Sequence, residues 1–288
     1  GEAFEMGPIA QGPGRIAKVT AKVRIQQPKV TRDVGELITF AIRIPLEIDM
    51  VVDHSAINPE LGGEEGFIAL SEALKENGLK LLLDIVPNHM GVGGSDNPWW
   101  LSVLEWGPLS PFAHAFDIDW ERLGANRNLV IPFLGDRYGE ALEQGTLVLK
   151  FDPEKGAFSV WHYDHQFPIR PLDYPTVLDR VLAAMVEVDE DAAGGLLGVA
   201  ERLRAMGEET NAERRQTFPA EAEGLKQRLA DLYGASPAIR EAMARTLRLL
   251  NGRKGHPESF GPLHRLLESQ AYRLAHWRVA ASAGSTSA

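Results

Sequence analysis

The chain has 288 residues, of which 44% are hydrophobic and 24% are charged, which is typical of a soluble globular protein with a sizeable core. Its formal net charge of −10 argues against nucleic-acid partners, which require clustered Lys and Arg. The absence of Cys excludes disulfides and thiolate metal sites, and no apolar run approaches the roughly 20 residues that span a bilayer. With no secretory signal in view, we expect a cytoplasmic protein without membrane partners.

The first 47 residues form an atypical N-terminal segment. Alternating side chains predict strands at residues 20–25 and 38–44, and Gly-Pro pairs predict loops between them. This segment contains no motif that indicates a function.

Residues 48–96 have the pattern of a partial barrel. Apolar residues at helical spacing predict a helix over 64–77, and Gly78 follows where such a helix would end. The apolar run 79–86 then predicts a buried strand. A helix, a short turn and a buried strand make half of a βαβ unit.

Residues 97–262 lack this repeat and are expected to form an insertion. The stretch 101–178 is irregular and aromatic, with a hairpin predicted from strands at 146–151 and 157–163. Spaced Leu, Ala and Val residues predict helices at 179–206, 220–233, 237–250 and 262–280. Residues 263–288 are thus interpreted as a helix and a frayed tail.

The polar residues at the end of the strand at 79–86 are the main candidates for a site. Asp84, Asn88 and His89 come where a barrel enzyme places its chemistry. In the functional interpretation, His89 donates a hydrogen bond to a substrate hydroxyl while Asn88 and Asp84 fix the loop. In the alternative, the three residues only satisfy backbone groups at the strand end.

Two further groups of residues extend this candidate site. Asp53 precedes a loop that a barrel would bring to the same rim, although an isolated Asp-His pair is more often a surface turn. Trp99 and Trp100 follow the strand in a predicted loop, where indole rings could stack on sugar faces. Their alternative role, shared with nearby Trp106 and Trp120, is core packing.

Metal and cofactor sites are not predicted. Asp53, His54, Asp84 and His89 could supply ligands, but they lack the spacing of known metal motifs. The glycines that follow His89 are not part of a phosphate-binding or dinucleotide-binding motif.

An ordered series of motifs gives the chain a resemblance to a known family. The series includes Val51-Val52-Asp53-His54-Ser55 and Asp84-Ile85-Val86-Pro87-Asn88-His89-Met90-Gly91-Val92. It continues at residues 57–67, 96–100, 103–108, 116–120, 131–136, 158–161, 163–165 and 270–279. Over roughly residues 51–279, the chain resembles the maltooligosyl trehalose synthases of the α-amylase superfamily.

The resemblance implies an α/β fold: a partial (β/α)8 TIM barrel of glycoside hydrolase type with a large, mainly helical insertion after the third strand. It implies an intramolecular transglycosylation that converts the reducing-end α-1,4 bond of a maltooligosaccharide into an α,α-1,1 bond, in cytoplasmic trehalose biosynthesis. Carried over by position, His89 contacts the sugar at the cleavage subsite, and Asp84 and Asn88 support its loop.

The chain also departs from the family pattern. Ile48-Asp49-Met50 replaces the family's Gly-Tyr-Asp, and residues 1–47 contain no counterpart of the first barrel strand. Retaining transfer uses two carboxylates about 5 Å apart, and the family's nucleophile lies in a Gly-x-Arg-x-Asp sequence that this chain lacks. Glu105, Asp117 and Asp136 are carboxylates, but none follows a buried apolar strand.

We therefore expect an N-terminal portion of such an enzyme, inactive alone and with catalytic residues that the sequence does not identify. A non-catalytic α-glucan-binding module and an α-glucan hydrolase are the alternatives.

Overall fold

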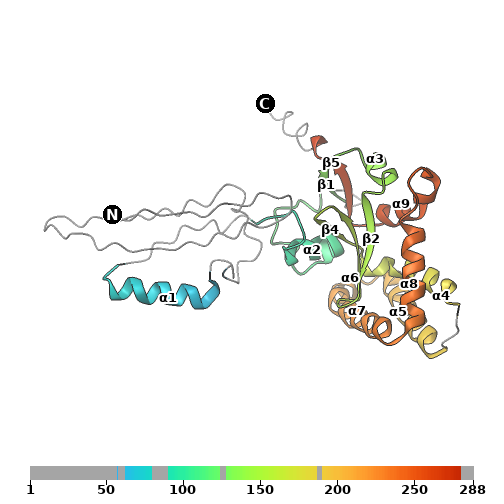
Figure 1. Cartoon of the computed structure of the whole chain (residues 1–288), viewed down its shortest axis with the longest axis horizontal. Coiled ribbons are helices and arrows are strands. Elements are labelled where there is room, and N and C mark those ends of the chain that lie inside the picture. The colour runs from blue at the N-terminus through green and yellow to red at the C-terminus, as the bar shows by residue number, and fades with distance from the viewer. Residues whose placement is uncertain (1–56, 58–61, 80–89, 124–127, 187–189, 280–288) are drawn as a thin grey trace. The chain divides into compact units, whose positions relative to one another are not determined.

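The computed structural model describes residues 57, 62–79, 90–123, 128–186 and 190–279 (Figure 1). The chain divides into two compact units, residues 1–92 and 93–288. The two strands predicted within residues 1–47 lie outside the described residues. So does the strand predicted at 79–86, apart from Leu79.

Helix α1 (Gly63–Glu76) is the described helix of the first unit and confirms the helix predicted there. Glu64 and Glu65 lie in its first turn and Lys75 in its last, where they complement the helix dipole. Asn77 caps the C-terminal end of α1, and Gly78 follows with φ of 66°, a conformation that favours glycine.

The second unit contains helices and two small sheets. Its helices are α2 (Pro98–Trp106), α3 (Tyr138–Glu143), α4 (Tyr174–Ala184), α5 (Glu190–Glu208), α6 (Ala212–Arg215), α7 (Phe218–Ala235), α8 (Pro237–Leu250) and α9 (Gly261–Glu268). Short 3-10 helices are η2 (Gly107–Leu109), η3 (Pro171–Asp173) and η4 (Pro257–Phe260). Its strands are β1 (Leu129–Leu134), β2 (Leu147–Asp152), β3 (Ala157–His162), β4 (His165–Pro168) and β5 (Tyr272–His276).

Strands β2, β3 and β4 form an antiparallel sheet in that order. The predicted hairpin is confirmed as β2 and β3, and the carboxylate of Asp152 accepts hydrogen bonds from the backbone N–H groups of Glu154 and Lys155 in the turn. Strand β4 was not predicted. On one face of the sheet, Leu149 and Phe158 are fully buried and form part of the core.

Strands β1 and β5 form a parallel pair. The helix predicted over 262–280 is therefore wrong beyond Glu268, where α9 ends and the chain turns into β5. Contacts distant in sequence decide this: the N–H of Leu129 donates to the carbonyl of Ala271 (2.8 Å), and the hydroxyl of Tyr272 donates to the carbonyl of Pro168 (3.0 Å).

The helix predicted over 179–206 is also wrong in part, because two helices occupy this range. Helix α4 ends at Ala184, and α5 begins at Glu190. Arg204 on α5 donates to Asp179 on α4 (2.9 Å), although 25 residues of one continuous helix would separate them by about 37 Å. The two helices pack against each other, and α4 also packs against α8.

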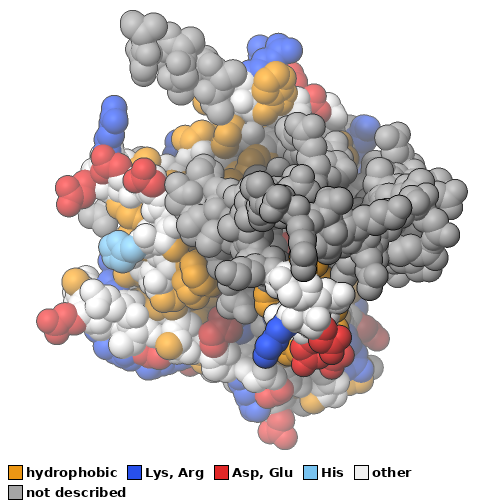
Figure 2. Space-filling model, turned by 90° about the vertical axis from the view of Figure 1, so that its left-hand side faces the viewer, with side chains coloured by type: hydrophobic (Ala, Val, Ile, Leu, Met, Phe, Trp, Pro, Cys, Tyr) orange, Lys and Arg blue, Asp and Glu red, His pale blue; other side chains and the backbone are white. Residues whose placement is uncertain are grey.

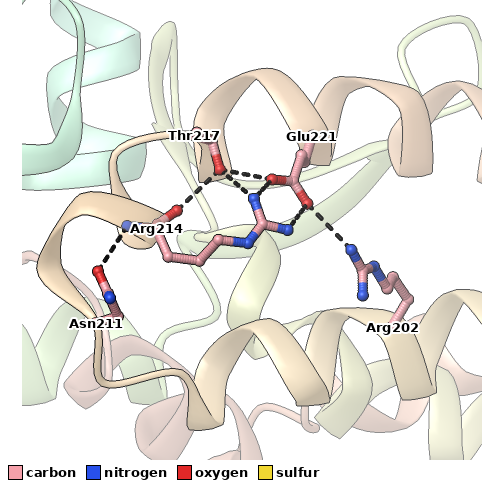
Figure 3. Close-up of polar contacts among 5 residues, drawn as sticks. All are labelled: Arg202, Asn211, Arg214, Thr217 and Glu221. Atoms are coloured by element: carbon pink, nitrogen blue, oxygen red, sulfur yellow. Dashed lines mark hydrogen bonds and ion pairs between the residues drawn. The ribbon is translucent and has the colours of Figure 1, made fainter.

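A polar network joins α5, α6 and α7 (Figure 3). Arg214 donates to both Thr217 and Glu221, and Arg202 of α5 donates to Glu221 (3.2 Å). Asn211 accepts from the N–H of Arg214 and caps α6. Hydrogen bonds from Arg214 and Thr217 lower the pKa of Glu221 to about 2, so this carboxylate is ionised at neutral pH.

Charged side chains of both signs are dispersed over the face shown in Figure 2. Acidic and basic groups alternate over the visible face of the described residues, and no large basic patch stands out there (Figure 2). None of the described helices is long and apolar enough to cross a membrane.

Candidate functional site

The structure describes two of the six predicted site residues. Trp99 and Trp100 lie in the first turn of α2, while Asp53, Asp84, Asn88 and His89 lie outside the described residues. Their predicted roles therefore remain predictions.

The loop predicted to carry Trp99 and Trp100 is wrong from Pro98 onward, because a helix begins there. The side chain of Asn97 accepts hydrogen bonds from the N–H groups of Trp99 and Trp100 (both 3.0 Å), and Pro98 occupies the first turn. Asn followed by Pro is a helix-start signal that the sequence already contained.

The two indole rings differ in exposure. Trp100 is only 9% exposed and packs edge-on against Phe116, with ring centres 5.1 Å apart. Trp99 is half-buried and stacks on Phe112, with ring centres 5.0 Å apart and planes 8° from parallel. Trp100 is thus buried, as is Trp106, and Trp99 is the more accessible of the two predicted sugar contacts.

Sequence reasoning missed the role of His165, which fixes the glycine-rich segment before α2. The N–H of Gly94 donates to Nδ1 of His165 (2.9 Å), and the N–H of Gln166 donates to the carbonyl of Gly94 (3.1 Å). The ring of His165 also stacks on Phe133, with ring centres 4.9 Å apart. Because Nδ1 accepts a hydrogen bond, this nitrogen carries no proton in this arrangement.

The second histidine of this sheet is structural. His162 is buried, and its Nδ1 lies 3.4 Å from the carbonyl oxygen of Thr146. Burial lowers the pKa of His162, so the neutral imidazole is favoured at neutral pH.

Glu105 is a buried carboxylate with a dedicated partner. Its oxygens lie 2.8 Å and 3.1 Å from the ammonium of Lys226, which also contacts Glu223 (2.8 Å). Burial raises the pKa of Glu105, and the Lys226 ammonium opposes that rise. Burial lowers the pKa of Lys226, but Glu105, Tyr174 and Glu223 together raise it above its usual value, so Lys226 remains charged.

The other two carboxylates considered for catalysis, Asp117 and Asp136, are exposed. Among the described residues, no three His, Asp or Glu side chains come together as ligands for a metal.

Comparisons with known proteins identify relatives of part of the chain. Residues 49–101 match the family model of the α-amylase catalytic domain. Two proteins from two strains of Mycobacterium tuberculosis, whose descriptions include the name maltooligosyl trehalose synthase, are 42% identical over 115 residues. The aligned region covers 37% of this chain and only 15% of each relative.

A solved structure of a mutant maltooligosyltrehalose synthase from Arthrobacter ramosus is 41% identical. The match covers 42% of this chain and 15% of that protein, with a TM-score of 0.35. The family-model match, together with the mixture of helices and strands, supports a glycoside-hydrolase-like α/β fold. Over part of its length, the chain is therefore similar to the α-amylase catalytic domain and to proteins named maltooligosyl trehalose synthase.

Proposed function

We propose that this chain provides substrate-contacting residues of an enzyme that rearranges maltooligosaccharides. The reaction converts the reducing-end α-1,4 linkage into an α,α-1,1 linkage by intramolecular transfer, which makes the enzyme an isomerase of trehalose biosynthesis. The observation that carries the proposal is the 42% identity over 115 residues to proteins named for this activity. We place the reaction in the cytoplasm.

The proposed fold is a partial (β/α)8 barrel with an insertion after its third strand. At the end of that strand, His89 donates a hydrogen bond to a glucose hydroxyl, and Asp84, Asn88 and Asp53 hold the surrounding loops. Trp99 offers an indole ring to an apolar sugar face. All of these groups bind and orient the sugar, and none of them forms or breaks the glycosidic bond.

The polypeptide alone is proposed to lack turnover. Retaining transfer requires a nucleophilic carboxylate and an acid/base carboxylate about 5 Å apart. The sequence contains no Gly-x-Arg-x-Asp motif, and the buried Glu105 is engaged by Lys226. These observations support binding without catalysis, the behaviour also expected of an α-glucan-binding module.

Incubation of the purified chain with maltopentaose tests this proposal. Loss of reducing ends reports the rearrangement, and calorimetric titration with the same sugar reports binding. Saturable binding without loss of reducing ends supports the proposal. Formation of a non-reducing product would overturn the proposed lack of turnover, and absence of binding would overturn the substrate-contacting role. Cellopentaose, with β-1,4 bonds, is the control sugar.

A further inference from the structure

The face of the β2–β3–β4 sheet opposite to the core carries a shallow groove. The strand register places Trp161 between Val148 and Gln166, and it places Ser159 beside Lys150. The groove has a volume of about 170 Å³ and is lined by Lys150, Phe151, Asp152, Ser159, Trp161 and Gln166. None of these residues belongs to the proposed site at the strand end.

Trp161 provides this groove with a flat aromatic surface. Its side chain is half-buried, and the ammonium of exposed Lys150 lies 4.9 Å from the ring centre. A cation–π contact at an exposed site is weak, and the long side chain of Lys150 has other rotamers available. An incoming ring can therefore displace Lys150 from the indole face.

The polar groups that line the groove offer both donors and acceptors. The amide nitrogen of Gln166 donates to the hydroxyl of Ser159 (2.9 Å), which leaves the Ser159 proton to donate and the Gln166 amide oxygen to accept. In Asp152, one carboxylate oxygen accepts the two turn N–H groups. Its second oxygen accepts no hydrogen bond from the described residues.

The charges of the groove balance. Lys150 and Asp152, two residues apart on β2, carry opposite charges, so neither an anion nor a cation is favoured over a neutral ligand. A neutral ligand with one flat apolar face and several hydroxyls at its edge matches a groove lined by an indole, an amide, a hydroxyl and a carboxylate. A hexopyranose has this chemistry.

We propose that this groove is a second α-glucan-binding site, in which one glucose ring of a maltooligosaccharide stacks on Trp161. Its hydroxyls hydrogen-bond to Ser159, Gln166 and Asp152. The volume is below the roughly 300 Å³ of ordinary ligand pockets, which suits one ring rather than a long chain. The groove chemistry selects a sugar, and only the choice of an α-1,4-linked glucan rests on the proposed function.

Calorimetric titration of the full chain with maltopentaose tests this site. The wild-type chain is expected to bind two equivalents, and Trp161→Ala is expected to remove one of them or to weaken it at least tenfold. Trp161→Phe, which keeps a smaller aromatic face, is expected to retain part of the affinity. Gln166→Ala removes a hydrogen-bonding group and leaves the Trp161 ring in place. Weaker binding in this variant therefore reflects a lost contact with the sugar and not lost folding.

Trp277→Ala is the matched control, because Trp277 is 52% exposed and also carries a cation, Arg278, 5.3 Å from its ring centre. This control is expected to leave both equivalents in place. Lys150→Ala, which uncovers the indole, is expected to tighten the second equivalent several-fold. Equal loss in Trp161→Ala and Trp277→Ala would overturn the specific role of Trp161.

His89→Ala distinguishes this inference from the proposed function. A single equivalent that His89→Ala removes and Trp161→Ala does not would overturn the second site and leave the proposed function standing. A single equivalent that Trp161→Ala removes and His89→Ala does not would support the groove and overturn the binding role of His89. Absence of any binding would overturn both.

Discussion

The ammonium of Lys226 on α7 lies 2.8 Å from the carboxylate of Glu105 on α2, and both side chains are buried. This ion pair joins the helix that carries Trp99 to the helical part of the second unit. Exposed Glu223 adds a further contact to Lys226. The pair therefore holds α2 in place, and with it the indole rings of its first turn.

Lys226→Met is expected to lower the free energy of unfolding by about 3–5 kcal/mol, because it leaves the carboxylate of Glu105 buried without its partner. The double variant Glu105→Leu/Lys226→Met is expected to recover most of this loss. Urea denaturation measures both. Lys254→Met is the control, since exposed Lys254 is expected to contribute less than about 0.5 kcal/mol. A loss for Lys226→Met no larger than the control's would contradict the structural role of the pair.

Gly156→Ala is expected to destabilise the hairpin turn far more than Gly145→Ala. Both glycines have positive φ angles, 58° and 72°, so each substitution costs about 1–2 kcal/mol of backbone strain. At Gly156 a Cβ would also overlap the carbonyl oxygen of Lys226, whereas nothing lies within 4 Å of a Cβ at Gly145. Thermal melting of the two variants isolates the steric contribution, and equal melting temperatures would show that the close approach is absent.

His165→Ala is expected to release the glycine-rich segment before α2. The variant removes the acceptor for the N–H of Gly94 and the ring that stacks on Phe133. One hydrogen bond contributes about 1 kcal/mol, so exchange of the Gly94 amide should accelerate roughly fivefold. Hydrogen exchange followed by NMR gives this rate, with the amide of Ile239 on α8 as a reference that should not change. Unaltered exchange at Gly94 would argue against the anchor.

The stability of the protein is expected to fall in mild acid through His162. Burial lowers the folded-state pKa of His162 below 6.5, so as pH falls the unfolded chain takes up the proton first. The contribution of His162 to the free energy of unfolding is therefore constant above about pH 6.5. Below that pH, protonation of His162 in the unfolded chain increasingly favours unfolding. His162→Asn should flatten the decrease in urea midpoint that the wild-type chain shows between neutral pH and this acid range. Parallel pH profiles for the two proteins would rule out His162 as the source.

Local sequence signals predicted the elements that depend on local interactions. The apolar periodicity and Gly78 predicted helix α1 and its end. Helix α8 begins at Pro237 and ends at Leu250 as expected. The β2–β3 hairpin surrounds a turn that Asp152 caps. In each case the determining contacts are close in sequence.

Strand β5 and the groove, which sequence analysis missed, depend on distant partners, whereas β4 and α2 were missed although β4 pairs with neighbouring β3 and Asn97 caps α2. Strand β5 forms because its backbone pairs with β1, more than 130 residues earlier, and this pairing outweighs the helical spacing of its Leu and Ala residues. The groove around Trp161 requires the register of three strands, which places Gln166 beside the indole ring. The sequence alone does not show that these two residues are neighbours. His165 likewise gains its role only through Gly94.

The central claim is that residues at the predicted strand end bind an α-glucan. Its most direct test is the dissociation constant for maltopentaose with and without His89→Ala, both in the Trp161→Ala background so that the groove does not contribute. We predict saturable binding that His89→Ala weakens at least tenfold, about 1.4 kcal/mol. Identical affinities in the two proteins would contradict the claim.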